Sequence, residues 1–163
     1  YVDALRATAA WADGVFATIG HSFGGLCVAL AAGDVPGPRE GACSPARLVL
    51  IASPAGVAAL MRRFATMLSL RPALVDRLRT HVATLSGRPV EAMEASAVLL
   101  GAASPVLVVH DTRDEEVPCA DGERLAAALP HGEFYVTTGL GHRRVARNPH
   151  VIRYAIDFLQ RPD

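Results

Sequence analysis

The sequence predicts an α/β fold, with a parallel sheet of about four strands, flanking helices and a helical insertion between two strands. Two observations predict this class. Short runs rich in Val, Leu and Ile alternate with longer segments whose apolar residues recur at helical spacing. One run, residues 47–52, is apolar at nearly every position, as expected of a parallel strand covered by helices on both faces. The length of 163 residues suits a single domain, residues 1–163.

Strands and helices alternate from the start of the chain. The predicted strands are residues 15–19, 47–52, 105–109 and 133–136. The predicted helices outside the insertion are residues 2–12 with Gly14 as the stop, residues 23–32, a helix carrying Leu125 and Leu129, and residues 148–159. A loop rich in Pro, Gly and Ser fills residues 34–45. This order implies parallel pairing, with functional loops at the carboxyl ends of the strands.

Residues 54–104 lie between the second and third predicted strands and have the pattern of amphipathic helices. One apolar stripe includes Met61, Phe64 and Leu68, and a second lies over residues 74–85. We therefore expect residues 54–104 to be a helical insertion between the second and third strands.

The final helix has a defined start and a predicted buried face. Asn148 followed by Pro149 fits an N-cap with proline at the first helical position. Ile152, Ile156 and Leu159 recur at helical spacing, so we expect these residues to face the core.

Charge and composition exclude several kinds of partner. The chain has 16 basic and 16 acidic residues, and neither sign forms a long block, so we expect no nucleic-acid partner. No apolar run approaches the roughly 18 residues that a membrane span needs. The cysteines have no metal-ligand spacing, and we expect no metal and no cofactor.

The three cysteines also bear on the compartment. Cys27, Cys43 and Cys119 are odd in number and far apart, which favours free thiols in a reducing compartment. We therefore expect a cytoplasmic protein. The chain opens on Tyr1 and not on Met, so an export signal upstream remains an alternative.

The turn after the first strand carries a serine between glycines. Residues 20–24 read Gly-His-Ser-Phe-Gly, the G-x-S-x-G pattern of a sharp turn that lifts a serine hydroxyl clear of the sheet. We expect a Cβ at Gly20 or Gly24 to clash with the neighbouring strand and helix. Ser22 is therefore a candidate nucleophile.

An acid and a histidine follow at two later strand ends. The loop after Val109 holds Asp111 and Asp114, and either carboxylate could orient a histidine. His142 lies beside a glycine after the last predicted strand and is a candidate general base. The order serine, acid, histidine, each at a carboxyl end of one parallel sheet, favours a catalytic triad.

Other polar residues near these loops have simpler interpretations. His21 adjoins the serine and is expected to pack or orient, with substrate contact as the alternative. We expect His110 to be structural and Cys27 to be buried. Glu115 and Glu116 are expected to be solvated.

The segments GHSFGG, PVLVVHDTRDEEVP and GLGHRRV resemble the nucleophile elbow, acid loop and histidine loop of the α/β-hydrolase superfamily. The resemblance extends over essentially the whole chain. It implies the C-terminal portion of a lid-bearing serine hydrolase, with a partial α/β-hydrolase fold and residues 54–104 as the lid. It also implies Ser22 as nucleophile, His142 as base and Asp114 as acid. Asp114 is favoured over Asp111 because the family's acid shortly precedes a Val-Pro pair, as Asp114 does here.

The implied chemistry is acyl transfer to water from a small-molecule ester, thioester or amide. The backbone N–H of Phe23 is expected to be one oxyanion donor. The expected substrate contacts are His21, Met61, Phe64 and Leu68. Two alternatives remain: an acyltransferase that uses the same triad, and a non-catalytic binding module that retains the triad by descent.

The first strand suggests that the sheet continues upstream. Residues 15–19 are apolar on both faces, like a central strand, yet no earlier strand is present in the sequence to pair with them. We therefore expect about four further strands upstream, together with the loop that supplies the second oxyanion donor.

Overall fold

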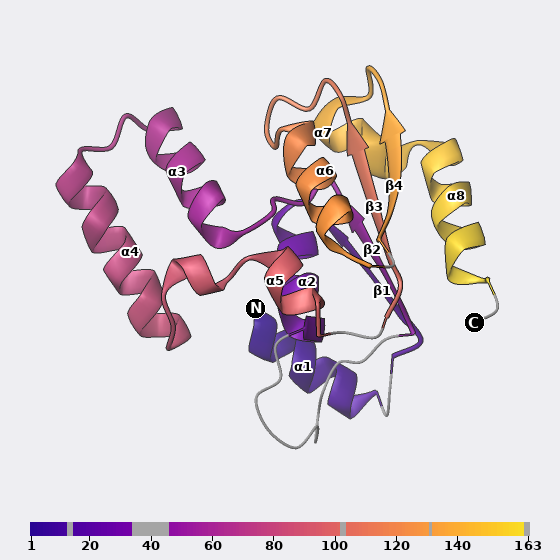
Figure 1. The fold of residues 1–163 in the computed structure, drawn as a ribbon, viewed down its shortest axis with the longest axis horizontal. Coiled ribbons are helices and arrows are strands. Elements are labelled where there is room, and N and C mark those ends of the chain that lie inside the picture. The colour runs from indigo at the N-terminus through magenta and orange to yellow at the C-terminus, as the bar shows by residue number, and fades with distance from the viewer. Residues whose placement is uncertain (13–14, 34–45, 102–103, 131, 162–163) are drawn as a thin grey trace.

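A computed structural model of the protein describes residues 1–12, 15–33, 46–101, 104–130 and 132–161. The predicted loop over residues 34–45, Cys43 and the predicted stop at Gly14 lie outside the described residues. The described residues contain a four-stranded parallel sheet in the order β1-β2-β3-β4 (Figure 1). The strands are β1 (Ala17–His21), β2 (Arg47–Ile51), β3 (Val106–Asp111) and β4 (Gly132–Thr137). The predicted α/β class is confirmed.

Three strands extend further toward their carboxyl ends than predicted, β4 by one residue and β1 and β3 by two. β1 ends at His21, whereas the sequence predicts an end before Gly20. β3 continues through His110 and Asp111, which the sequence places in the following loop. Backbone pairing decides these ends, since His21 pairs with β2 and Asp111 pairs with Thr137 of β4.

β1 lies at one edge of the described sheet. Ile19 is 54% exposed, and Phe16 just before the strand is 70% exposed. All five residues of β2 are buried, as the continuous apolar run predicts for a strand covered on both faces.

Helices cover both faces of the sheet. The helices are α1 (Val2–Trp11), α2 (Phe23–Gly33), α3 (Val57–Met67), α4 (Pro72–Ser86), α5 (Ala95–Leu99), α6 (Cys119–Ala128), α7 (Gly141–Arg144) and α8 (Pro149–Leu159), with 3₁₀ helices η1 (Val90–Ala92) and η2 (Val145–Arg147). One core lies between the sheet and α2, α5 and α6, and the other between the sheet and α8. Side chains alternate between these cores, so Leu50 joins the first and Ile51 the second. Cys27 of α2 is buried, as predicted.

α8 begins as predicted but buries a different face. The Asn148 side chain accepts hydrogen bonds from the first turn of the helix, so the predicted N-cap is confirmed. The prediction that Ile152 and Ile156 face the core is wrong, because these residues are 44% and 46% exposed. The buried residues of α8 are Val151, Ala155 and Phe158.

Contacts with β4 fix this orientation of α8. The ring of Tyr154 stacks on Tyr135, with ring centroids 4.2 Å apart. The Tyr154 hydroxyl donates to the Glu133 carboxylate. The shift by one residue is therefore a consequence of packing, since both faces have the same helical period.

Residues 54–104 leave the sheet after β2 and return before β3. Figure 1 shows α3 and α4 projecting sideways from the body of the molecule. The two ends of the excursion meet in an isolated bridge between Gly56 and Glu94, and the Ala95 N–H donates to the Ala55 carbonyl at 2.8 Å. The predicted stripes pack only in part, because α4 has no buried residue. No helix among the described residues is both long and apolar enough to cross a bilayer.

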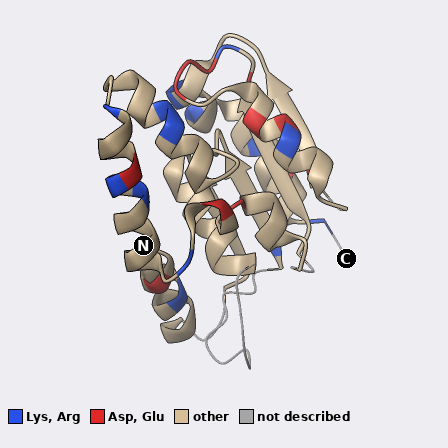
Figure 2. Ribbon diagram, turned by 60° about the vertical axis from the view of Figure 1, so that its left-hand side comes forward, with Lys and Arg blue, Asp and Glu red and all other residues tan. Residues whose placement is uncertain are grey.

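Acidic and basic residues are mixed along the chain. Figure 2 shows acidic and basic residues interleaved along the ribbon, although the charged residues of α3 and of α7 are all arginines. Ion pairs join elements that are distant in sequence, such as Arg63 of α3 with Asp121 of α6 and Arg161 with Glu133. Some of the acidic and basic residues that balance in number thus also form ion pairs in the fold.

Candidate active site

The turn between β1 and α2 holds Ser22 in a left-handed backbone conformation. Its φ is 56°, which is uncommon for a residue with a side chain. The Ser22 N–H donates to the Ile51 carbonyl of β2, and the Gly25 N–H donates to the Ser22 carbonyl, each at 2.9 Å. These bonds hold the strained residue in place, so its hydroxyl stands at the carboxyl end of the sheet.

Close backbone packing explains two of the glycines near Ser22. A Cβ on Gly20 would lie 2.5 Å from the Cα of Gly25, and a Cβ on Gly25 would lie 2.9 Å from the Cβ of Ser53. The prediction for Gly24 is wrong in the described structure, since a Cβ there would have nothing within 4 Å. Gly20 and Gly25 are the pair that lets β1 and α2 approach.

Ser22, His142 and Asp114 form one hydrogen-bonded line. The Ser22 Oγ lies 2.9 Å from the His142 Nε2, and the His142 Nδ1 lies 2.7 Å from the Asp114 Oδ2. His142 and Asp114 are each only 8% exposed. With Nδ1 donating to the carboxylate, Nε2 is free to accept a proton from the serine hydroxyl.

The acid loop holds Asp114 through its other oxygen. The Asp114 Oδ1 accepts the backbone N–H groups of Glu116 at 2.9 Å and Val117 at 2.8 Å. Both oxygens of the carboxylate are therefore bonded, and Oδ2 is directed at His142. This arrangement orients the imidazole ring.

Asp111 has a different environment and a different task. It is buried and accepts bonds from the Thr137 hydroxyl at 2.7 Å and the Leu140 N–H at 2.9 Å. Burial alone would raise the pKa of Asp111, but the N–H groups of Gly141 and Leu140, with the Thr137 hydroxyl, lower it to about 2. Asp111 thus fastens the loop after β4, whereas Asp114 contacts the imidazole.

That loop places His142 on a short helix. Gly139 and Gly141 have φ values of 86° and 67°, which favour glycine. His142 follows in α7 and is buried. α7 packs against β3, and Asp111 accepts the N–H groups of Gly139 and Leu140 just before it, so the backbone at His142 is held in place.

His21 connects the serine turn to the histidine loop. Its Nε2 lies 2.8 Å from the backbone oxygen of His142, and the two imidazole rings are 4.9 Å apart. Since a carbonyl oxygen only accepts, the hydrogen in this bond belongs to His21. His21 therefore orients the histidine backbone, and a contact of His21 with substrate stays a prediction.

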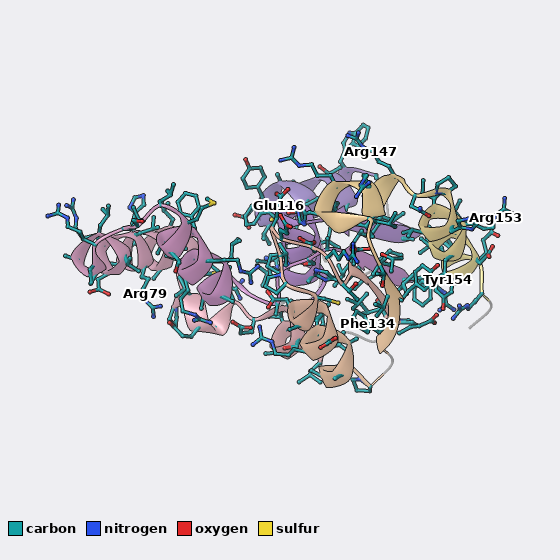
Figure 3. The ribbon with its side chains drawn as sticks, turned by 90° about the horizontal axis from the view of Figure 1, so that it is seen from above. Arg79, Glu116, Phe134, Arg147, Arg153 and Tyr154 are labelled. Carbon is teal, nitrogen blue, oxygen red and sulfur yellow. The ribbon has the colours of Figure 1, made fainter. Side chains whose placement is uncertain are left out.

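Glu116 is a neighbour of the site that the sequence does not reveal. Its carboxylate lies 3.9 Å from the His142 Nε2 and 3.2 Å from the Arg143 Nε. Its backbone oxygen accepts from Arg63 of α3, on the side facing the insertion (Figure 3). The Glu116 side chain is 52% exposed, so it is solvated as predicted, and it also pairs with Arg143. Only the fold brings α3 to this loop.

The predicted substrate contacts in the insertion have different environments. Met61 is buried in the first core. Phe64 and Leu68 are 45% and 50% exposed. The stripe is therefore not one packed face, and a contact of these residues with substrate stays a prediction.

The chain resembles a known protein family and several solved structures. The sequence profile of the TAP-like proteins, which are α/β-hydrolases, matches residues 76–163, just over half of the chain. The chain belongs to this family. The predicted resemblance to the α/β-hydrolase superfamily is thereby confirmed.

Solved structures share the fold of the TAP-like chain. The esterase domain of a Rhodothermus marinus protein has a TM-score of 0.64 and 24% identity over 98% of this chain. The butyrate-bound esterase Est2 from Thermogutta terrifontis has a TM-score of 0.69 and 17% identity over 97%. A bromoperoxidase from Bacillus anthracis has a TM-score of 0.62 and 14% identity over 97%.

The lengths of these proteins differ from that of the TAP-like chain. The chain spans 66% of the Rhodothermus marinus domain and 64% of Est2, less than two thirds of either, and 72% of the bromoperoxidase. No curated protein sequence matches it. The structural likeness establishes a partial α/β-hydrolase fold.

Proposed function

We propose that this TAP-like protein is a serine hydrolase that cleaves a carboxylic ester, a thioester or a small amide through an acyl-enzyme. The proposed nucleophile is Ser22, the base is His142 and the acid is Asp114. The observation that carries the proposal is the unbroken line of two hydrogen bonds, 2.9 and 2.7 Å long, that joins these three side chains.

In the proposed reaction the Ser22 Oγ attacks the carbonyl carbon of the substrate while its proton passes to the His142 Nε2. The tetrahedral intermediate collapses as the bond to the leaving group breaks and His142 returns the proton to that group. Water then attacks the carbonyl carbon of the acyl-enzyme while its proton passes to His142. The second intermediate collapses as His142 returns the proton to the Ser22 Oγ, and the carboxylic acid is released. The negative charge of Asp114 stabilises the imidazolium that exists between the two transfers.

The backbone N–H of Phe23 is the proposed oxyanion donor. Phe23 is the first residue of α2, so its N–H has no acceptor within the helix. The helix N-terminus adds a partial positive charge at the same place. Removing one such donor from a site typically slows the reaction by roughly a hundredfold to a thousandfold.

The proposed substrate is a small molecule with an acyl group. The similar solved structures include esterases, one of them with butyrate bound. The proposed lid, residues 54–104, presents the partly exposed apolar side chains of Phe64 and Leu68. These side chains are the proposed contacts of the acyl group, with His21 as a further candidate.

A fluorophosphonate probe tests the proposal. It should label the wild-type protein covalently, and Ser22→Ala should abolish the labelling, because the probe reacts only with an activated serine. Ser86→Ala is the matched control, since Ser86 is exposed on α4 and should be dispensable for labelling.

Two other outcomes favour other functions. A folded wild-type protein that never reacts with the probe would contradict the proposal and favour a binding module. A labelled protein that passes its acyl group to an added alcohol in preference to water would favour an acyltransferase.

A further inference from the structure

His110 is a buried histidine that the proposed reaction does not use. Along β3 the side chains alternate, so Asp111 lies on the side of the histidine loop and His110 on the side of α6. His110 is completely buried. A buried imidazole in the strand that leads to the acid loop requires an explanation, because an apolar residue would fill the space at lower cost.

One nitrogen of His110 points at the acid loop. Its Nε2 lies 2.9 Å from the backbone oxygen of Val117 and 3.4 Å from the Asp114 Oδ2, the oxygen that also contacts His142. Both neighbours of this nitrogen are acceptors, so Nε2 carries the hydrogen. The N–H is therefore donated to the Val117 carbonyl, with the Asp114 carboxylate next to it.

The other nitrogen is held against α6. The His110 Nδ1 has no hydrogen-bond partner among the described residues. A Cβ built on Gly122 would lie only 2.6 Å from this nitrogen, so the bare backbone of α6 packs on the ring. This close contact limits the rotation of the imidazole and keeps Nε2 directed at the acid loop.

The contacts form a closed chain around the acid. The His110 N–H is donated to the carbonyl of Val117, and the Val117 N–H is donated to the Asp114 Oδ1. A shift of the ring would break its hydrogen bond to Val117 and weaken the hydrogen bonds with which the loop holds Asp114. An error of about 1 Å in a catalytic group can cost on the order of a hundredfold in rate.

We propose that His110 is a positioning residue for the triad, which holds the Asp114 carboxylate in line with His142 through Val117 and through its own Nε2–H. This inference rests on the proposed function, because it assigns His110 a task only if Asp114 and His142 assist a nucleophile.

The test compares His110→Gln with His110→Met. Glutamine and methionine have the same length and similar volume, but only glutamine places an N–H donor where Nε2 lies. We expect His110→Met to slow fluorophosphonate labelling of Ser22 by about tenfold or more. His110→Gln should stay within about threefold of wild type. With a substrate, the loss in His110→Met should fall on kcat and leave KM nearly unchanged.

A second measurement does not require catalysis. The ring nitrogen chemical shifts of His142 report the hydrogen bond between its Nδ1 and Asp114. They should change in His110→Met and remain close to wild type in His110→Gln. Val106→Ala removes volume from the same face of β3 away from the site, so it should lower stability without changing these shifts.

The outcomes separate this inference from the proposed function. If the wild-type protein is not labelled, the proposed function fails, and an unchanged His142 spectrum in His110→Met would overturn the positioning role as well. If wild type is labelled but both variants react at the same rate, His110 only fills space and the inference fails. If His110→Met does not fold, His110→Asn replaces it, since the shorter amide cannot reach Val117. Equal labelling of the Gln and Asn variants would then overturn the inference.

Discussion

At the scale of single residues, the two aspartates after β3 show how the surroundings assign different tasks to the same side chain. Asp111 and Asp114 are three positions apart, and both lie at the carboxyl end of one strand. Asp111 is surrounded by donors from the loop after β4, whereas Asp114 keeps one oxygen for His142. Alternation along the strand and the turn that follows it produce this difference.

Replacing each aspartate by asparagine distinguishes their tasks. Asp114→Asn should lower kcat by roughly a thousandfold or more while the fold remains intact, because the amide disturbs the tautomer of His142. Asp111→Asn should mainly lower stability, because its NH₂ group would replace one of the two oxygens and face either the Gly139 N–H or the Leu140 N–H. Kinetics and thermal unfolding of both variants check this. A greater loss of kcat in Asp111→Asn would contradict the assignment.

The lowered pKa of Asp111 predicts how the free energy of unfolding depends on pH. Its pKa falls from an ordinary 3.8 to about 2 in the folded protein, so its carboxylate favours the folded state at pH values above the unfolded pKa. This contribution, about 2 kcal/mol, should be lost as the pH falls from near 4 toward 2. Denaturant unfolding at several pH values measures it. The wild-type free energy of unfolding should fall more steeply in this window than that of Asp111→Asn, and parallel curves would contradict the prediction.

At the scale of elements, α8 shows the limit of hydrophobic periodicity. Ile152 and Ile156 lie on one helical stripe, and Val151 and Ala155 lie on the stripe one residue earlier. Both stripes have the same period, and the larger side chains suggest the wrong one. The small side chain of Ala155 lets the helix approach the sheet, and the ring of Tyr154 stacks on β4.

Alanine substitutions on the two stripes should therefore differ. Val151 is completely buried, so Val151→Ala should lower the free energy of unfolding by about 2 kcal/mol. Ile152→Ala removes a larger side chain from an exposed position and should change stability by about 0.5 kcal/mol or less. Urea unfolding of both variants checks this. A larger loss for Ile152→Ala would mean that this face is covered by another part of the protein.

At the scale of the whole molecule, two regions differ in how they are held. The sheet has a buried core on each face. The α3–α4 part of the insertion projects from it, and α4 buries no residue (Figure 1). Its attachment to the body includes the ion pair of Arg63 with Asp121 and the contact of Met61 with the first core. A segment with so little burial should open locally at lower cost than the sheet.

Hydrogen exchange tests this difference directly. Amides of α4 should exchange at least about tenfold faster than those of β2 under native conditions, since opening α4 exposes little apolar surface. Asp121→Ala should raise exchange in α3, because it removes the carboxylate that Arg63 holds. Exchange in β2 should stay unchanged in that variant. Equal protection of α4 and β2 would show that the insertion and the sheet open as one unit.

Much of the fold and the site was predictable from sequence because it depends on local rules. The alternation of strands and helices, the N-cap at Asn148 and the serine turn at Ser22 each depend on neighbouring residues. Glu116 beside His142 and the tight contact of Gly25 were not predictable. Both depend on contacts between segments that are distant in the chain, and no local sequence pattern predicts such contacts.

The class of fold, the parallel pairing of the strands and the α/β-hydrolase superfamily follow from the sequence, because periodicity and short motifs are properties of contiguous residues. The ends of β1 and β3 and the buried face of α8 depend instead on contacts in the folded protein. Different strand ends and helix orientations have similar local energies. The energy differences between them arise only when distant segments come into contact.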